Sequence, residues 1–284
     1  MKYKLFMRAF SAIPLCGTLC ALTTLILACN LANPVPPTPT TAPSVVVPTA
    51  TADTRGVVTF NNVSFTLPIG VANDARSEMV AAVTDANASP SWELAPAHLQ
   101  FQLTGYQLQD KFLEPQVLVY PAGEYAQLNQ AAADQIQRLK TLLAGASLSK
   151  DAMPIVPAFN AGPVFAAHMQ LLDFQDGRGV RMITQYAQYL ATVNNHELFY
   201  HFQGLTDDGK YYIIAVLPVS SSILAEDDKL DAPVPPGGVP APSTGPDAAY
   251  YAAVTSALDA MYPDSFNPSL FQLDTLVKSI TVTP

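Results

Sequence analysis

The chain has 284 residues, of which 49% are hydrophobic and 13% are charged, and its formal net charge is −9. This apolar content is typical of a globular protein with a core, and the length allows one large domain or two small ones. The acidic balance, with no offsetting cluster of Lys or Arg, argues against nucleic-acid binding and against electrostatic adsorption to anionic lipids.

The cysteines restrict the possible chemistry. All three, Cys16, Cys20 and Cys29, lie near the N-terminus, and the chain after Asn30 contains none. Disulfides, thiol nucleophiles and thiolate zinc sites are therefore excluded from the expected folded part.

The N-terminal segment has the layout of a secretory signal. A basic stretch ends at Arg8, and an uncharged apolar run continues to Ala28. The run ends in "ILAC", residues 26–29, which resembles the bacterial lipobox; Ala28 and Cys29 fit that pattern best, and Leu27 is bulkier than it prefers. The alternative is a plain signal anchor whose cysteine is incidental.

The lipobox resemblance implies cleavage between Ala28 and Cys29 and attachment of a diacylglyceryl group to the Cys29 thiol. Residues 1–28 would then be a signal peptide, and their removal would take the net charge from −9 to −12, because they carry three basic and no acidic residues. Two or more acyl chains on one cysteine anchor a protein stably. We therefore expect an extracytoplasmic protein that is lipid-anchored to the bacterial cell membrane.

Residues 29–54 are rich in proline and threonine and carry almost no charge. Such a composition favours extended polyproline conformations, which would span on the order of 75 Å here. We interpret this segment as a stalk between the anchor and a single globular domain of residues 55–284. The alternative is a disordered tail without a role.

Four short strands and a helix are expected first in that domain. "VVTFNNVSFTLP" predicts two strands around a tight turn at Asn61-Asn62, and "HLQFQLTGY" and "PQVLVY" predict one strand each. Residues 79–83 indicate a further strand more weakly. Residues 124–145 then carry the apolar stripe of one amphipathic helix that ends at Gly145. The stripe consists of Leu128, Ala132, Ile136, Leu139 and Leu143.

Two long hairpins and two helices follow. The hairpins join residues 164–174 to 180–189, and 196–205 to 210–219, through turns at 176–179 and 206–209. The first helix is expected over 247–262, and the second begins after Asn267 as N-cap and Pro268 at the first helical position. Their stripes are Tyr250, Val254, Leu258 and Met261, and Leu270, Leu273, Val277 and Ile280.

The second hairpin indicates the fold class. If Leu205 pairs with Lys210, both faces of the hairpin are apolar, so both need cover from helices. One face would carry Leu198, Tyr200, Phe202, Ile213, Ala215 and Leu217, and the other Phe199, His201, Tyr212, Ile214 and Val216. The prediction is an α+β fold with a largely antiparallel sheet sandwiched between helices. The order of elements, with "FTLP" early and "LDTLVKSITV" last, resembles the PsbP-type three-layer sandwich, a resemblance that carries no catalytic motif.

"HELFYH", residues 196–201, is the segment most suggestive of chemistry. It resembles the H-E-x-x-H zinc motif, but the second histidine comes one residue late and the segment is β-rich. On a strand, His196 and His201 would point to opposite faces, so one metal ion could not use both. We therefore expect no metal site, and His201 is interpreted as a half-buried, hydrogen-bonded strand residue.

Other signatures of enzymes are weak. The sequence has no G-x-S-x-G elbow and no phosphate-binding Gly-Lys loop, and the acidic run at 226–228 lacks the alternating ligands of a calcium loop. The proline-rich residues 225–247 are expected to form a flexible surface loop, interpreted as a spacer with a ligand-binding lid as the alternative.

The leading hypothesis is a non-enzymatic domain that binds a small molecule or an envelope partner, without a cofactor. The alternatives are a metal-free hydrolase with a dispersed Ser/His/acid site and a purely structural surface lipoprotein. Any ligand-binding residues remain open, with His201 and Gln203 as weak candidates.

Overall fold

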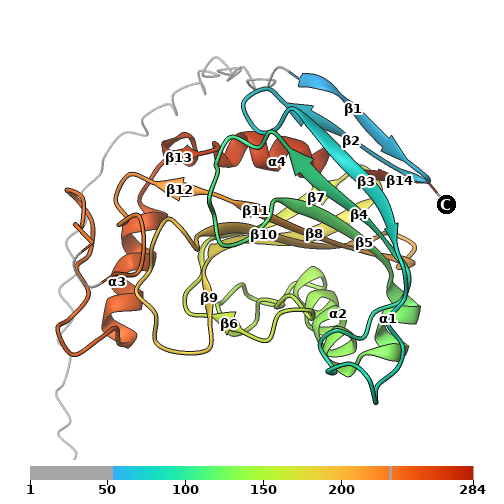
Figure 1. The fold of residues 1–284 in the computed structure, drawn as a ribbon, viewed down its shortest axis with the longest axis horizontal. Helices are drawn as coiled ribbons and strands as arrows, with labels where there is room; N and C mark the ends of the chain where they lie inside the picture. The colour runs from blue at the N-terminus through green and yellow to red at the C-terminus, as the bar shows by residue number, and fades with distance from the viewer. Residues whose placement is uncertain (1–53, 230–231, 284) are drawn as a thin grey trace, which may run out of the picture. The chain divides into compact units, whose positions relative to one another are not determined.

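A seven-stranded antiparallel sheet forms the centre of the fold (Figure 1). The computed structural model describes residues 54–229 and 232–283, so the predicted cleavage and lipidation residues, Ala28 and Cys29, lie outside the described residues. In spatial order the sheet consists of β3 (Asp74–Val80), β4 (His98–Thr104), β5 (Gln116–Pro121), β11 (Tyr211–Pro218), β10 (Phe199–Thr206), β8 (Gly177–Thr184) and β7 (Ala167–Phe174).

Three smaller sheets accompany it in the described part of the chain. They are β1 (Thr54–Phe60) with β2 (Val63–Pro68) and β14 (Thr281–Val282), β6 (Gly162–Pro163) with β9 (Tyr186–Ala187), and β12 (Ser220–Ser221) with β13 (Phe266–Asn267). The predicted hairpin at Asn61-Asn62 is confirmed, and Asn61 has a φ of 50°, a conformation that asparagine tolerates well.

The predicted helix of residues 124–145 is instead two helices, α1 (Ala122–Leu128) and α2 (Gln130–Leu143). Asn129 separates them because its extended backbone lets its side chain cap α2 by accepting a hydrogen bond from the Ala132 amide at 3.1 Å. Its amide nitrogen also donates to the Leu94 carbonyl at 2.9 Å. Gly145 follows the end of α2 with a φ of 106°, as expected for a helix C-terminus.

The two C-terminal helices are α3 (Ala248–Asp259), capped by Asp247, and α4 (Leu270–Lys278), which follows the short 3₁₀ helix η1 (Pro263–Ser265). The prediction of Asn267 as the N-cap of α4 was wrong. Ser269 takes that role in a capping box with Gln272, and Asn267 pairs with Ser220 in the β12–β13 ladder. The apolar stripes of both helices are buried as predicted, apart from the partly buried Met261.

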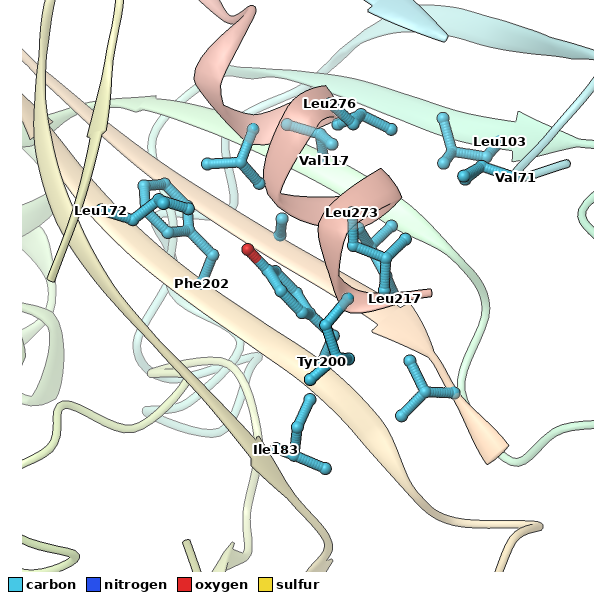
Figure 2. Packing of buried hydrophobic residues seen from close by; sticks show 14 of the residues in the cluster. Val71, Leu103, Val117, Leu172, Ile183, Tyr200, Phe202, Leu217, Leu273 and Leu276 are labelled. Atoms are coloured by element: carbon cyan, nitrogen blue, oxygen red, sulfur yellow. The ribbon is translucent and has the colours of Figure 1, made fainter. Parts of the chain in front are cut away.

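Helices cover both faces of the central sheet (Figure 1), which establishes a mixed α+β fold. On one face, α3, α4 and the β1–β2–β14 sheet enclose one buried cluster, and Figure 2 shows α4 lying over Tyr200 and Leu217. On the other face, α1, α2 and the irregular segment of residues 148–161 enclose a second cluster.

The β10–β11 hairpin has the predicted faces but a different register. Leu205 pairs with Tyr212 rather than with Lys210. The shift is two residues, and side chains alternate with a period of two, so no side chain changes face. Tyr200 lies in the cluster under α4 and Tyr212 in the cluster under α2, as predicted.

The β7–β8 hairpin turns at Gln175-Asp176, earlier than the expected 176–179, since Phe174 pairs with Gly177. Gly177 and Gly179 therefore lie within β8. A Cβ at Gly179 would come 2.5 Å from the Phe202 ring and 2.3 Å from the Gln203 carbonyl oxygen. These glycines serve close packing of rings and backbone rather than the turn itself.

A buried ion pair joins the sheet to α4. Nε of Arg181, on β8, donates to Oδ1 of Asp274 at 3.1 Å, and both side chains are almost fully buried. Tyr200 donates to the same oxygen at 2.9 Å, and a second Arg181 nitrogen donates to Gln170 at 2.9 Å. Both charged groups thus have hydrogen-bonding partners, as burial requires.

The expected loop of residues 225–247 contains no helix or strand among its described residues. Val239 and Ala241 nevertheless pack against the cluster under α4. The residue before the loop is held by Asn195, whose amide nitrogen donates to the Leu224 carbonyl at 3.1 Å.

Candidate functional site

His201 and Gln203, the weak candidates from the sequence, lie side by side on β10 beneath the irregular segment. Both are buried, so His201 is less accessible than the expected half-buried residue. The Gln203 amide nitrogen lies 2.8 Å from Nε2 of His201, and its amide oxygen accepts a hydrogen bond from the Tyr212 hydroxyl. Because an amide nitrogen only donates, Nε2 of His201 accepts this hydrogen bond.

The same burial removes His201 from acid–base chemistry. Burial lowers the pKa of its imidazole to about 3, so the ring stays neutral at physiological pH. Nδ1 lies 3.5 Å from the Tyr186 hydroxyl, which also accepts from the Val156 amide at 3.2 Å. The cluster is closed and its members bind one another, so it offers a substrate no accessible base.

The first three residues of "HELFYH", residues 196–198, lie outside the strand. β10 begins at Phe199, and His196 and Glu197 occupy the preceding turn. His196 is exposed and its Nδ1 lies 2.9 Å from the Asp110 carbonyl oxygen, whereas His201 is buried. Among the described residues, no group of three His, Cys, Asp or Glu side chains is placed to hold a metal ion.

A large open groove runs beside α3, and we call it the α3 groove. Its volume is about 1220 Å³. One wall is the solvent-facing side of α3, including Tyr251, Ala252 and Thr255. The other walls come from residues 148–150, from the β6–β7 region with Phe165 and Met169, and from Leu190 after β9. Most of these side chains are apolar.

The β6–β9 ladder also borders a second hollow of about 520 Å³, which we call the aromatic pocket. It is lined by Phe112, Leu113, Ala158, Phe159, Asn160, Ala161, Tyr186, Ala187, Gln188, Tyr189 and Glu197. Ala187 lines both hollows. Tyr186 connects the pocket to the buried cluster, since its hydroxyl is the one that approaches His201.

Glu197 is the only acidic residue that lines the aromatic pocket among the described residues, and no Lys or Arg lines it. Two amide nitrogens donate to its Oε2, from Gln185 at 2.6 Å and from Asn194 at 3.2 Å. Burial raises the pKa of this carboxyl above its usual value; the Asn194 hydrogen bond and His196 oppose the shift, and Asp228 adds to it. Among the described residues, no Lys or Arg forms an ion pair with this carboxylate, and His196 is the positively charged neighbour that opposes the rise in its pKa.

Neither hollow was predicted from the sequence. Glu197 drew attention only as the acid of a possible zinc motif and Tyr189 only as the last residue of a predicted strand, while Phe112 lies in a segment without periodicity. No sequence pattern identifies these two aromatic residues as pocket residues, and in the structure Phe112 is 64% and Tyr189 is 62% exposed.

No helix in residues 54–229 or 232–283 is both long enough and apolar enough to span a bilayer. Comparison of the chain with protein families, with curated proteins and with solved structures found no match.

Proposed function

We propose that the chain is a lipid-anchored, extracytoplasmic protein whose domain binds an apolar small molecule in the α3 groove without catalysing a reaction. The α3 groove is the observation that carries this proposal. Its volume of about 1220 Å³ is above the range of typical ligand pockets, and its lining is mainly apolar, with Lys150, Asp247 and Asp259 as its charged residues among those described. The PsbP-like arrangement belongs to the same proposal and is supported by the helices on both faces of the sheet.

The groove favours a ligand over a substrate. Ser149, Ser256, Asp247 and Asp259 lie on its lining, but no histidine is among the described lining residues. The nearest histidine in sequence to these walls, His168, uses its Nε2 for the Leu258 carbonyl at 2.8 Å. The described lining of the α3 groove therefore does not supply the histidine base that a Ser/His/acid site needs.

Two exposed alanines on α3 provide a matched test of the groove. Ala252 lines it, whereas Ala253 is exposed outside it. Ala252→Trp should weaken binding of the neutral apolar dye Nile red by about tenfold or more, because the indole would fill the groove; tenfold corresponds to ~1.4 kcal/mol. Ala253→Trp should leave the dye affinity unchanged.

Mass spectrometry of an organic extract of the purified full-length protein would identify a natural ligand. Equal dye binding by both tryptophan variants and the wild type would contradict the groove as the binding site. If none of them bound dye and the extract contained no ligand, the structural surface lipoprotein would become the better hypothesis.

The anchor is tested separately, since it rests on the "ILAC" junction of residues 26–29, on the apolar run before it and on the proline-rich segment after it. Cys29→Ser should move the protein out of the membrane fraction or leave an unprocessed precursor, because serine has no thiol to be alkylated. Mass spectrometry of the mature wild-type N-terminus should find acyl chains on Cys29. An unmodified Cys29 would contradict lipid anchoring while leaving the α3 groove untouched.

A further inference from the structure

The aromatic pocket has more aromatic side chains than the α3 groove, whose described lining contains Phe165 and Tyr251. Four aromatic side chains, those of Phe112, Phe159, Tyr186 and Tyr189, line a hollow that also contains the carboxylate of Glu197. They come from three segments that are distant in sequence, and the β4–β5 loop is fixed to the turn before β10 by the Phe112 amide, which donates to the His196 carbonyl at 2.9 Å.

Aromatic rings attract cations through the negative potential of their faces, and the attraction increases when the cation leaves water. A carboxylate at the same place adds a full negative charge. Both amide donors to Glu197 bind Oε2, and no hydrogen bond reaches Oε1 from the described residues. This oxygen is therefore available to a ligand.

The rim of the pocket is also acidic. The Tyr189 hydroxyl lies 3.5 Å from Oδ2 of Asp228, which places a second carboxylate beside the opening. No Lys or Arg is among the described lining residues, and the whole chain is acidic with a net charge of −9. An anionic or zwitterionic ligand would meet repulsion here that a simple cation would not.

We propose that the aromatic pocket binds a small alkylated ammonium ion that carries no neighbouring anionic group. The alkyl groups pack against the aromatic walls, and the positive charge lies near Glu197. A primary ammonium group is a poorer fit, since it needs three hydrogen-bond acceptors and the apolar walls supply few. This site is separate from the α3 groove, so the two proposals can fail independently.

Calorimetric titration of the purified protein tests the charge requirement with defined probes. Choline and tetramethylammonium should bind, and 3,3-dimethylbutan-1-ol, the neutral isostere of choline, should bind at least about tenfold more weakly, given the usual size of desolvated cation–π contacts. Glycine betaine and phosphatidylcholine vesicles carry the same quaternary group beside an anion and should also bind more weakly than choline. Equal affinity for choline and its neutral isostere would overturn the proposal, and tighter binding of either zwitterionic probe would overturn the requirement for a cation without an anion.

Two variants locate the site. Glu197→Gln keeps an oxygen that can accept from Gln185 and Asn194 and should weaken choline binding by about tenfold, as removal of the charge predicts. Tyr189→Leu should weaken it several-fold by removing one wall. The control is Glu124→Gln, an exposed glutamate on α1 that does not line the pocket. Unchanged choline affinity in a folded Glu197→Gln protein would exclude this pocket as the site.

Discussion

The two faces of the central sheet are both buried, yet they differ in the polar groups that they enclose and in the covers that enclose them. The face under α4 contains the charged pair of Arg181 and Asp274. The opposite face contains the neutral cluster of His201, Gln203 and Tyr212. Adjacent residues of β10 serve the two clusters, since Tyr200 donates to Asp274 and His201 accepts from Gln203.

The segments that cover the two faces also differ, and the two candidate hollows follow this difference. The face under α4 is closed by regular helices and a small sheet, and its charges are satisfied inside the protein. The other face is partly covered by irregular chain of residues 148–161, and this chain contributes to the walls of both the α3 groove and the aromatic pocket. Irregular segments of this kind leave hollows at the surface, whereas packed helices cover a sheet more completely. The buried His201 thus belongs to the interior of this protein, whereas the candidate binding hollows lie where the cover is irregular.

The largest effect is expected when the charged cluster loses one partner. Asp274→Ala leaves the Arg181 guanidinium buried without a counter-charge and removes the acceptor of Tyr200. We expect a loss of about 3–5 kcal/mol in the free energy of unfolding, measured by urea denaturation. The double variant Arg181→Met with Asp274→Leu should recover most of this loss, because no charge remains buried.

The control for this prediction lies on the same hairpin. Arg178 and Asp173 form an ion pair at 2.6 Å, but both side chains are exposed. Asp173→Ala should therefore cost less than about 1 kcal/mol. Equal costs for Asp173→Ala and Asp274→Ala would show that burial does not determine the value of these pairs.

The neutral cluster should make the stability of the protein sensitive to acid. Burial lowers the pKa of His201 to about 3. The unfolded chain therefore binds a proton at this histidine near pH 6.5, whereas the folded chain binds it only near pH 3. This depressed pKa gives stability that is present above pH 6.5 and is lost progressively as the pH falls toward 3. The histidine alone should remove roughly 2 kcal/mol between pH 6.5 and pH 4.5.

Substitution within "HELFYH" separates this effect from other acid-sensitive groups. His201→Gln should lower stability by about 1–3 kcal/mol at pH 7, since a buried partner is left unsatisfied. The same variant should lose less than the wild type on acidification, as urea denaturation at pH 7 and pH 4.5 would measure. His196→Gln, at the exposed end of the motif, should retain the wild-type slope. A flattened slope in His196→Gln instead would mean that the acid-sensitive histidine has been misplaced.

Periodicity in the sequence predicted the parts of the fold that burial controls. The two faces of β10 and β11 and the stripes of α3 and α4 follow from side-chain spacing, and this spacing is unaffected by the two-residue register shift. Local hydrogen bonds escaped prediction: Asn129 divides a helix, and Ser269 replaces Asn267 as a cap. The aromatic pocket escaped as well, because Phe112, Phe159 and Glu197 meet only through tertiary packing of irregular segments.

The smallest effect concerns Glu197, the carboxylate that distinguishes the open pocket from the closed clusters. Its pKa is raised in the folded protein, chiefly by burial, so folding disfavours its charged form. A raised pKa contributes stability below the unfolded value of 4.5, and that contribution is lost as the pH rises through the folded value. Glu197→Gln should therefore raise Tm slightly at pH 7, by at most a few degrees, and should not raise it at pH 4.

This direction is opposite to the one that a structural role predicts. If the hydrogen bonds from Gln185 and Asn194 were the purpose of the side chain, removal of its charge would weaken them, and Tm would fall at pH 7. Glu124→Gln removes an exposed charge from the first turn of α1, outside the pocket, and so serves as the comparison for loss of a surface charge at both pH values. A charged group that is retained at a cost to stability is typical of binding sites. A fall of several degrees in the Tm of Glu197→Gln would show that Glu197 has a structural role, like the buried clusters. The aromatic pocket would then lack a charge that is kept for binding.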